Sequence, residues 1–179
     1  MGFFGCGGMK DPVMREIGEK IRKGLFLTDV DRYNIRIASE ECGWEVEDLM
    51  MDLARIDEDP RKLEDHYLAI HRKYLGKAED YRLSGDLVKA SIYLWGSITA
   101  LLKAHASRIG VHLHQWDLRD LRSVASKLSD KEERIQFHEL LNCGEVLYSH
   151  AEDKDVEDDQ WFRDLWSKCT KIIKEISKK

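Results

Sequence analysis

Hydrophobic residues between positions 84 and 110 recur at steps of three and four, the spacing of one face of an α-helix. Asp86 stands where a helix N-cap is expected, and Gly110 stands where a left-handed C-cap would end the helix. The segment therefore predicts one long helix with one buried stripe. That stripe consists of Leu87, Ser91, Leu94, Trp95, Ile98, Leu101, Leu102, His105 and Ile109.

Small side chains follow one flank of this predicted helix. Ala90, Ser97 and Ala104 are seven residues apart, so they form a line along it. Gly96 adds a gap without a side chain. We therefore expect a neighbouring helix to approach closely here.

The remaining pattern predicts three short helices before an acidic break at residues 57–60 and four further helices after it. Ser129 and Glu132 have the spacing of a capping box for one of them. We predict an all-α fold: an antiparallel bundle of four to five long helices at 60–179 and a small three-helix N-terminal attachment at 1–59, with a disordered glycine-rich start. The predicted helices cover 11–24, 28–43, 45–56, 60–83, 118–128, 129–148 and 162–176.

The composition agrees with this fold and argues against nucleic acid as a ligand. The 179 residues include only two prolines, fewer turn signals than a sandwich or barrel needs. A net charge of −5 argues against nonspecific binding of nucleic acid. Residues 45–56 could be the second helix of a helix-turn-helix, but Glu45, Glu47, Asp48 and Asp52 would be repelled by phosphates. We expect no DNA binding, and instead a helical hairpin packed on the bundle or on a partner.

Metal, cofactor and membrane signals are weak. His66 and His71 are five residues apart and point to different helix faces, and neither a P-loop nor a dinucleotide-binding motif occurs. We expect no metal and no cofactor. The scattered Cys6, Cys42, Cys143 and Cys169 suit free thiols in a reducing cytosol. The chain has no apolar run long enough for a bilayer, so we expect a cytoplasmic protein without membrane contact.

The densest group of polar residues follows the long predicted helix and consists of Arg108, His112, His114, Gln115 and Trp116. Arginine and histidine together can bind a phosphodiester, the guanidinium holding charge and the imidazole moving a proton. The same side chains can equally serve as polar groups at a helix C-terminus.

The segments GDLVKASIYLWGSITALLKAHASRIG and GEVLYSHAED resemble the archaeal PaREP-type families of the HEPN superfamily, over about Lys62 to Ile176. The resemblance implies a small helical bundle. Many HEPN proteins are RNases with an arginine and a histidine separated by a short spacer, or partner a nucleotidyltransferase in toxin–antitoxin pairs. Arg108 and His114, with five residues between them, satisfy that spacing, whereas Arg134 and His138 do not.

We favour a noncatalytic HEPN-like interaction module, the protein-binding half of a two-gene system with a partner of nucleotidyltransferase type. The alternative is a metal-independent RNase that uses Arg108 and His114, with RNA as its substrate. We also expect a homodimer, because Trp161, Phe162 and Trp166 concentrate large rings in the last helix. The same rings could instead complete the core of the monomer.

Overall fold

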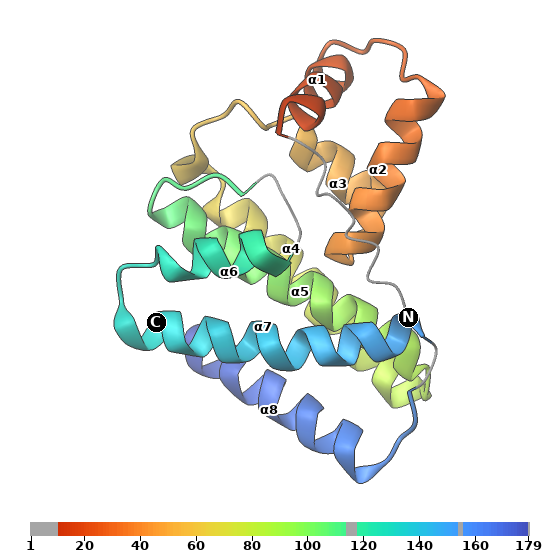
Figure 1. The fold of residues 1–179 in the computed structure, drawn as a ribbon, viewed down its shortest axis with the longest axis vertical. Coiled ribbons are helices and arrows are strands. Elements are labelled where there is room, and N and C mark those ends of the chain that lie inside the picture. Colours follow the sequence, from red (N-terminus) through yellow and green to blue (C-terminus); the bar gives the residue numbers. More distant parts are fainter. Residues whose placement is uncertain (1–10, 114–117, 154–155, 179) are drawn as a thin grey trace.

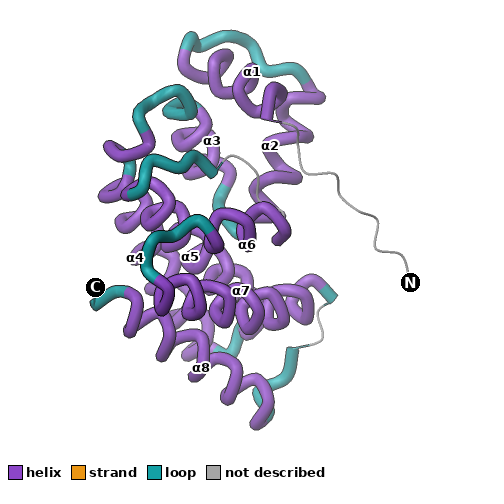
Figure 2. The backbone as a smooth tube through the Cα atoms, turned by 60° about the vertical axis from the view of Figure 1, so that its left-hand side comes forward, coloured by secondary structure: helices purple, strands orange, loops and turns teal. Residues whose placement is uncertain are grey.

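The computed structural model describes residues 11–113, 118–153 and 156–178. Within these ranges the regular secondary structure is entirely helical, and no residue is in a β-strand (Figures 1 and 2). The predicted all-α fold is therefore confirmed. The helices are α1 (Asp11–Arg22), α2 (Asp29–Cys42), α3 (Val46–Leu53), α4 (Glu64–Ser84), α5 (Leu87–Arg108), α6 (Leu118–Ser126), α7 (Lys131–Glu152) and α8 (Gln160–Ile176), with a 3₁₀ turn at Pro60–Lys62.

Helix α5 is the centre of the molecule, with α4 and α7 packed along it and α8 packed on α7 (Figure 1). Buried positions account for 17 of its 22 residues. The sequence predicted one buried stripe, but α5 is covered on nearly all sides, because the N-terminal helices lie over the flank that the bundle leaves open. Among the described residues, no helix combines the length and apolar character needed to cross a membrane.

Several helix ends follow the sequence signals, but Pro60 opens a separate 3₁₀ turn and not the long helix α4, which begins at Glu64. Gly85 ends α4 with a φ of 85°, and the Asp86 carboxylate accepts a hydrogen bond from the Lys89 amide at 3.1 Å. The predicted cap of α7 at Ser129 is wrong. Asp130 occupies the N-cap instead, because its carboxylate accepts from the Glu133 amide at 2.7 Å.

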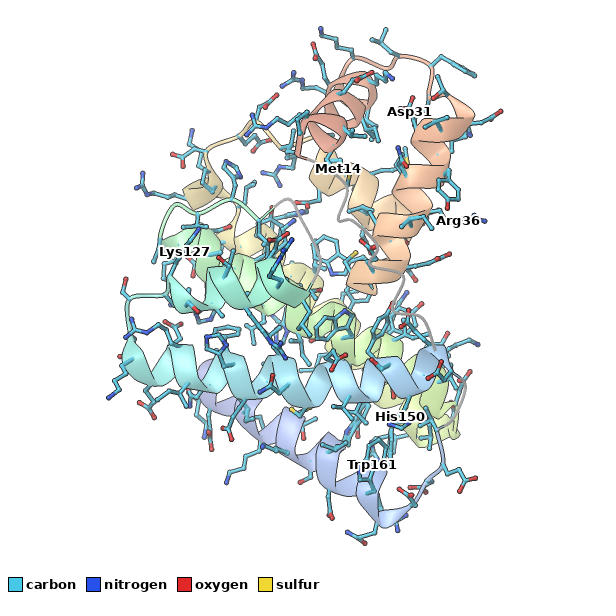
Figure 3. The ribbon with its side chains drawn as sticks, in the orientation of Figure 1. Met14, Asp31, Arg36, Lys127, His150 and Trp161 are labelled. Carbon is cyan, nitrogen blue, oxygen red and sulfur yellow. The ribbon has the colours of Figure 1, made fainter. Side chains whose placement is uncertain are left out.

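The large rings of α8 divide between the core and the surface. Phe162 and Trp166 are 1% and 7% exposed, so they complete the core of the monomer. Trp161 is 41% exposed and lies edge-on to His150, with 4.7 Å between ring centroids (Figure 3). Of the three rings, only Trp161 offers a large free surface to a second subunit.

The α1–α3 helices pack on the bundle through a second apolar cluster. Met14 and Leu49 are fully buried there, together with Tyr74 of α4 and Ala104 of α5. Ala104 belongs to the predicted line of small residues. Of that line, only Ala104 faces the N-terminal helices, because Ala90 belongs to the bundle core and Ser97 bonds to His71 of α4.

The turn between α2 and α3 approaches the backbone of α5 closely. A Cβ atom added to Gly96 would lie 2.3 Å from the carbonyl oxygen of Gly43, which itself has a φ of 69°. The Trp44 indole donates to the Gly96 carbonyl at 3.0 Å and to the Thr99 hydroxyl at 3.1 Å. Gly96 therefore provides the predicted gap, and a turn, not a helix, fills it.

Gly96→Ala should destabilise the fold by about 1–3 kcal/mol, because the methyl group collides with backbone that the Trp44 hydrogen bonds hold in place. Gly76→Ala is the matched control, since an added Cβ in α4 meets nothing within 4 Å. It should stabilise by about 0.5–1 kcal/mol. Urea unfolding of both variants measures the difference. Equal effects would show that the turn does not need the gap.

Candidate functional site

Of the predicted site residues, the structure describes Arg108 and His112. Arg108 is the last residue of α5, and its guanidinium binds the Glu64 carboxylate at the start of α4, with Nη2 2.7 Å and Nε 2.9 Å from Oε1. His114, Gln115 and Trp116 lie outside the described residues. The pairing of Arg108 with His114 therefore stays a prediction.

His112 lies beside residues of the N-terminal helices, whereas Arg108 is paired with Glu64. With Lys103, Asp52 and Tyr67, it lines a cavity of about 10 Å³, roughly the space for one water molecule. Burial lowers the pKa of His112, and the positive charges of Arg15 and Lys103 lower it further. The Asp52 carboxylate acts in the opposite direction and raises it.

Two other histidines of the bundle are committed to internal contacts. His105 is 3% exposed and its Nδ1 pairs with the Glu133 carboxylate, while burial lowers its pKa against the opposing effect of Glu133. His71 is buried, with its Nδ1 2.8 Å from the Ser97 hydroxyl. Among the described residues, no group of three or more His, Cys, Asp or Glu side chains is arranged to hold a metal ion.

Sequence reasoning missed a buried ion pair between α3 and α5. The Lys103 ammonium contacts the Asp52 carboxylate, which also accepts from the Tyr67 hydroxyl at 2.7 Å. The ammonium lies 5.1 Å from the Trp44 ring centroid and 4.7 Å from that of Tyr67. Both charges are nearly inaccessible, at 3% and 7% side-chain exposure. The two rings and the hydroxyl replace part of the lost hydration.

The same face of α3 makes two more polar contacts with the bundle. Asp48 accepts from Lys73 at 2.7 Å and from the Tyr74 hydroxyl. Glu45 binds Lys77 and accepts from the Tyr93 hydroxyl at 3.0 Å. Three of the four carboxylates that argued against phosphate binding are thus the contacts that dock α3 on α4 and α5, and the fourth, Glu47, is exposed.

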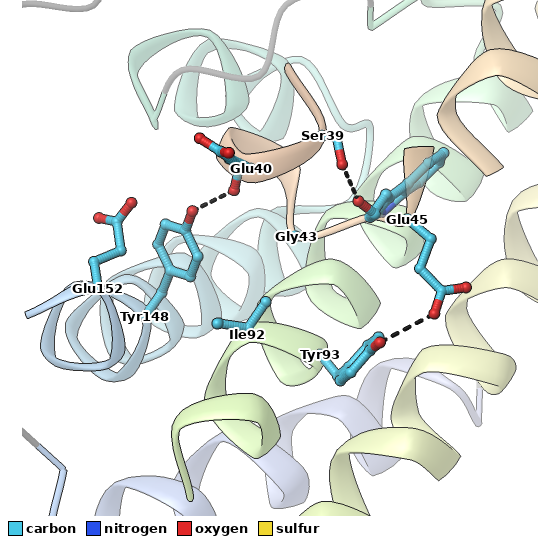
Figure 4. A pocket seen from close by; sticks show the side chains of 9 residues that line it. Ser39, Glu40, Gly43, Glu45, Ile92, Tyr93, Tyr148 and Glu152 are labelled. Carbon is cyan, nitrogen blue, oxygen red and sulfur yellow. Dashed lines mark hydrogen bonds between the residues drawn. The ribbon is translucent and has the colours of Figure 1, made fainter. Parts of the chain in front are cut away.

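An open groove lies where the α2–α3 turn meets α5 and the end of α7 (Figure 4). Its volume is about 380 Å³, within the range of small-ligand pockets. The Tyr148 hydroxyl donates to the Glu40 carbonyl across one end of it, and the Tyr93 hydroxyl bonds to Glu45 at the other. The lining residues are Ser39, Glu40, Gly43, Trp44, Glu45, Ile92, Tyr93, Tyr148 and Glu152.

Negative charge accumulates at the α7 end of this groove. Burial raises the pKa of Glu152, and the neighbouring carboxylates of Asp153, Glu40 and Glu145 raise it further, while the Tyr148 hydroxyl lowers it. Lysines balance Glu45 at the other end. The α7 end is therefore an acidic site beside aromatic rings, and the four elements that build it carry no common motif in the sequence.

Comparison with family models, with curated proteins and with solved structures finds no match to this chain. What these findings and the fold establish together is a small all-helical protein.

Lys103→Met should cost about 3–5 kcal/mol, because it leaves the Asp52 carboxylate buried without its cation. Adding Asp52→Asn to that variant should restore part of the loss, since it removes the unpaired charge. Lys89→Met, which breaks the exposed pair with Asp86, is the control and should cost less than about 1 kcal/mol. Chemical unfolding of the four proteins tests this. A cost for Lys103→Met no larger than the control would contradict the role given to the pair.

Proposed function

We propose that this chain is a noncatalytic, HEPN-like interaction module that binds a cationic segment of a partner protein in the groove between the α2–α3 turn and α7. The observation that carries the proposal is the gathering of carboxylates around Glu152, where Glu40 and Glu152 line the groove together and Asp153 and Glu145 lie near enough to raise the pKa of Glu152. It stands in a groove of about 380 Å³ lined by aromatic rings.

The chemistry of the groove favours a lysine or arginine side chain as ligand. An ammonium or guanidinium group would relieve the repulsion between the Glu40 and Glu152 carboxylates. Its aliphatic stem would pack against the rings of Tyr93 and Tyr148 and the side chain of Ile92. A partner that presents a basic segment suits the interaction role that the HEPN resemblance implies, and a nucleotidyltransferase-type protein is our candidate for it.

The noncatalytic part of the proposal is supported by how the reactive groups are used. Arg108 is paired with Glu64, His105 with Glu133, and Lys103 with Asp52. Each pairing explains the residue by a structural contact. We retain the proposed homodimer, with the exposed Trp161 as the ring available to a second subunit.

A short peptide containing three lysines should bind the groove, and its acetyl-lysine counterpart should not, because acetylation removes the charge. Glu152→Gln and Glu40→Gln should each weaken binding by about threefold to tenfold. Binding should also weaken on acidification, starting above the usual range of a glutamate, because protonation of Glu152 with its raised pKa removes the attraction. Calorimetric titration at several pH values and salt concentrations measures this.

The matched control is Glu47→Gln, an exposed acidic position of α3 that does not line the groove. It removes the same charge and should leave peptide affinity unchanged. The folded-state pKa of Glu152 lies above its ordinary value, so ionisation of this group weakens the fold as pH rises, and Glu152→Gln should not destabilise the protein at neutral pH. If Glu47→Gln and Glu152→Gln lowered the peptide affinity equally, the peptide would be held by the overall negative charge of the protein and not by the groove.

The RNase alternative makes a separate prediction at Arg108. We expect no cleavage of single-stranded RNA in EDTA, because the Arg108 guanidinium is held by Glu64. Arg108→Ala should then change only stability, by at most about 1 kcal/mol, as is typical of an exposed ion pair. RNA cleavage by the wild type that both Arg108→Ala and His114→Ala abolish, with their helical content intact, would establish the RNase and reject the noncatalytic proposal.

A further inference from the structure

Two cysteines meet in the core between α7 and α8. The Sγ atoms of Cys143 and Cys169 are 2.6 Å apart, and these residues are 4% and 0% exposed. The sequence predicted buried or free thiols, because the cysteines are too scattered to form a CxxC pair. Antiparallel packing of α7 and α8 brings them into contact.

We propose that Cys143 and Cys169 form a site of reversible covalent modification, at which a low-molecular-weight disulfide converts the two thiols into an intramolecular disulfide that links α7 to α8. The contact between the two sulfur atoms supports this, since a disulfide requires the side chains of both cysteines to face each other. Cys42, the other cysteine among the described residues, bonds to the Ser39 carbonyl instead.

Cys143 is the attacking group. The neighbouring Cys169 thiol, by its hydrogen bond, and the charge of Lys168 lower the pKa of Cys143, whereas the same hydrogen bond and burial raise the pKa of Cys169. When α8 opens locally from α7, the small disulfide reaches Cys143, whose thiolate attacks one sulfur of the small disulfide and forms a mixed disulfide. The thiolate that leaves takes up the proton that Cys143 gave up.

The second step closes the link. Cys169 loses its proton and attacks the Cys143 sulfur, which breaks the bond to the small molecule and releases a second small thiol. Two protein thiols and one small disulfide thus become one protein disulfide and two small thiols. The small disulfide is the oxidant and is reduced, and excess small thiol reverses the reaction.

The link would hold α8 against α7 at the middle of both helices. It closes a loop of 26 positions that contains the acidic connection between them. Loop closure of this size restricts the unfolded chain, so the oxidised protein should melt about 5–10 °C above the reduced one.

The test is oxidation of the full-length protein by glutathione disulfide under native conditions. Intact mass should fall by two hydrogen atoms, and peptide mapping should recover Cys143 joined to Cys169. The melting temperature should rise and return to its starting value after dithiothreitol. Cys143→Ser and Cys169→Ser should abolish the rise, whereas Cys42→Ser should retain it. Cys42 is a suitable control because it is also buried, bonds to the Ser39 carbonyl and has a raised pKa.

The mass and peptide measurements on the wild type keep the test decisive even if a serine variant folds poorly, and Cys143→Ala provides a second, apolar replacement. A glutathione adduct that persists on Cys143 would overturn the proposal. So would unreacted Cys143 and Cys169 in native protein, or a cross-link found only between two chains.

Discussion

The docking of the acidic face of α3 onto lysines and tyrosines of the bundle is the constraint on which the arrangement of the N-terminal helices depends. Asp52 is the deepest contact, with Lys103 and the Tyr67 hydroxyl as partners inside the core. Ions in such a place are costly unless every group is satisfied. A shift of α3 along α5 would leave Asp52 and Lys103 buried and unpaired, so this pair specifies the register of the N-terminal helices more than it adds to stability.

That register determines the position of the groove. Once α3 is docked, the preceding turn is held against α5 by the contact of Gly43 with Gly96 and by the indole of Trp44. The Tyr148 hydroxyl reaches the Glu40 carbonyl from α7 and sets the other wall. The groove is therefore formed by the docking of the N-terminal helices on the bundle. A change in the buried ion pair that moved α3 would also move the α2–α3 turn, which forms one wall of the groove.

The predictable part of the structure is the part that depends on near neighbours in sequence. Helix periodicity and caps such as Asp86 and Gly85 gave the order and approximate bounds of the helices, since their hydrogen bonds are local. The sequence predicted a close approach at Gly96. It did not predict which segment approaches, because Gly43 lies far away in the sequence. The acidic residues of α3 were visible, yet their lysine partners lie 25–51 positions away. In the same way, the spacing of Arg108 and His114 did not reveal that Arg108 pairs with Glu64, which is 44 positions away in the sequence.

A central helix buried on nearly all sides links the two halves of the molecule. One side of α5 carries Leu94 and Ile98 into the bundle core, and the other carries Ala100 and Ala104 into the N-terminal cluster. Its single buried cation, Lys103, stands on the second side. The apolar side alone is enough to specify a helical bundle, and bundles of this kind serve many functions. What distinguishes this chain is therefore the polar side, where Gly96, Thr99 and Lys103 receive the N-terminal helices and so create the acidic groove.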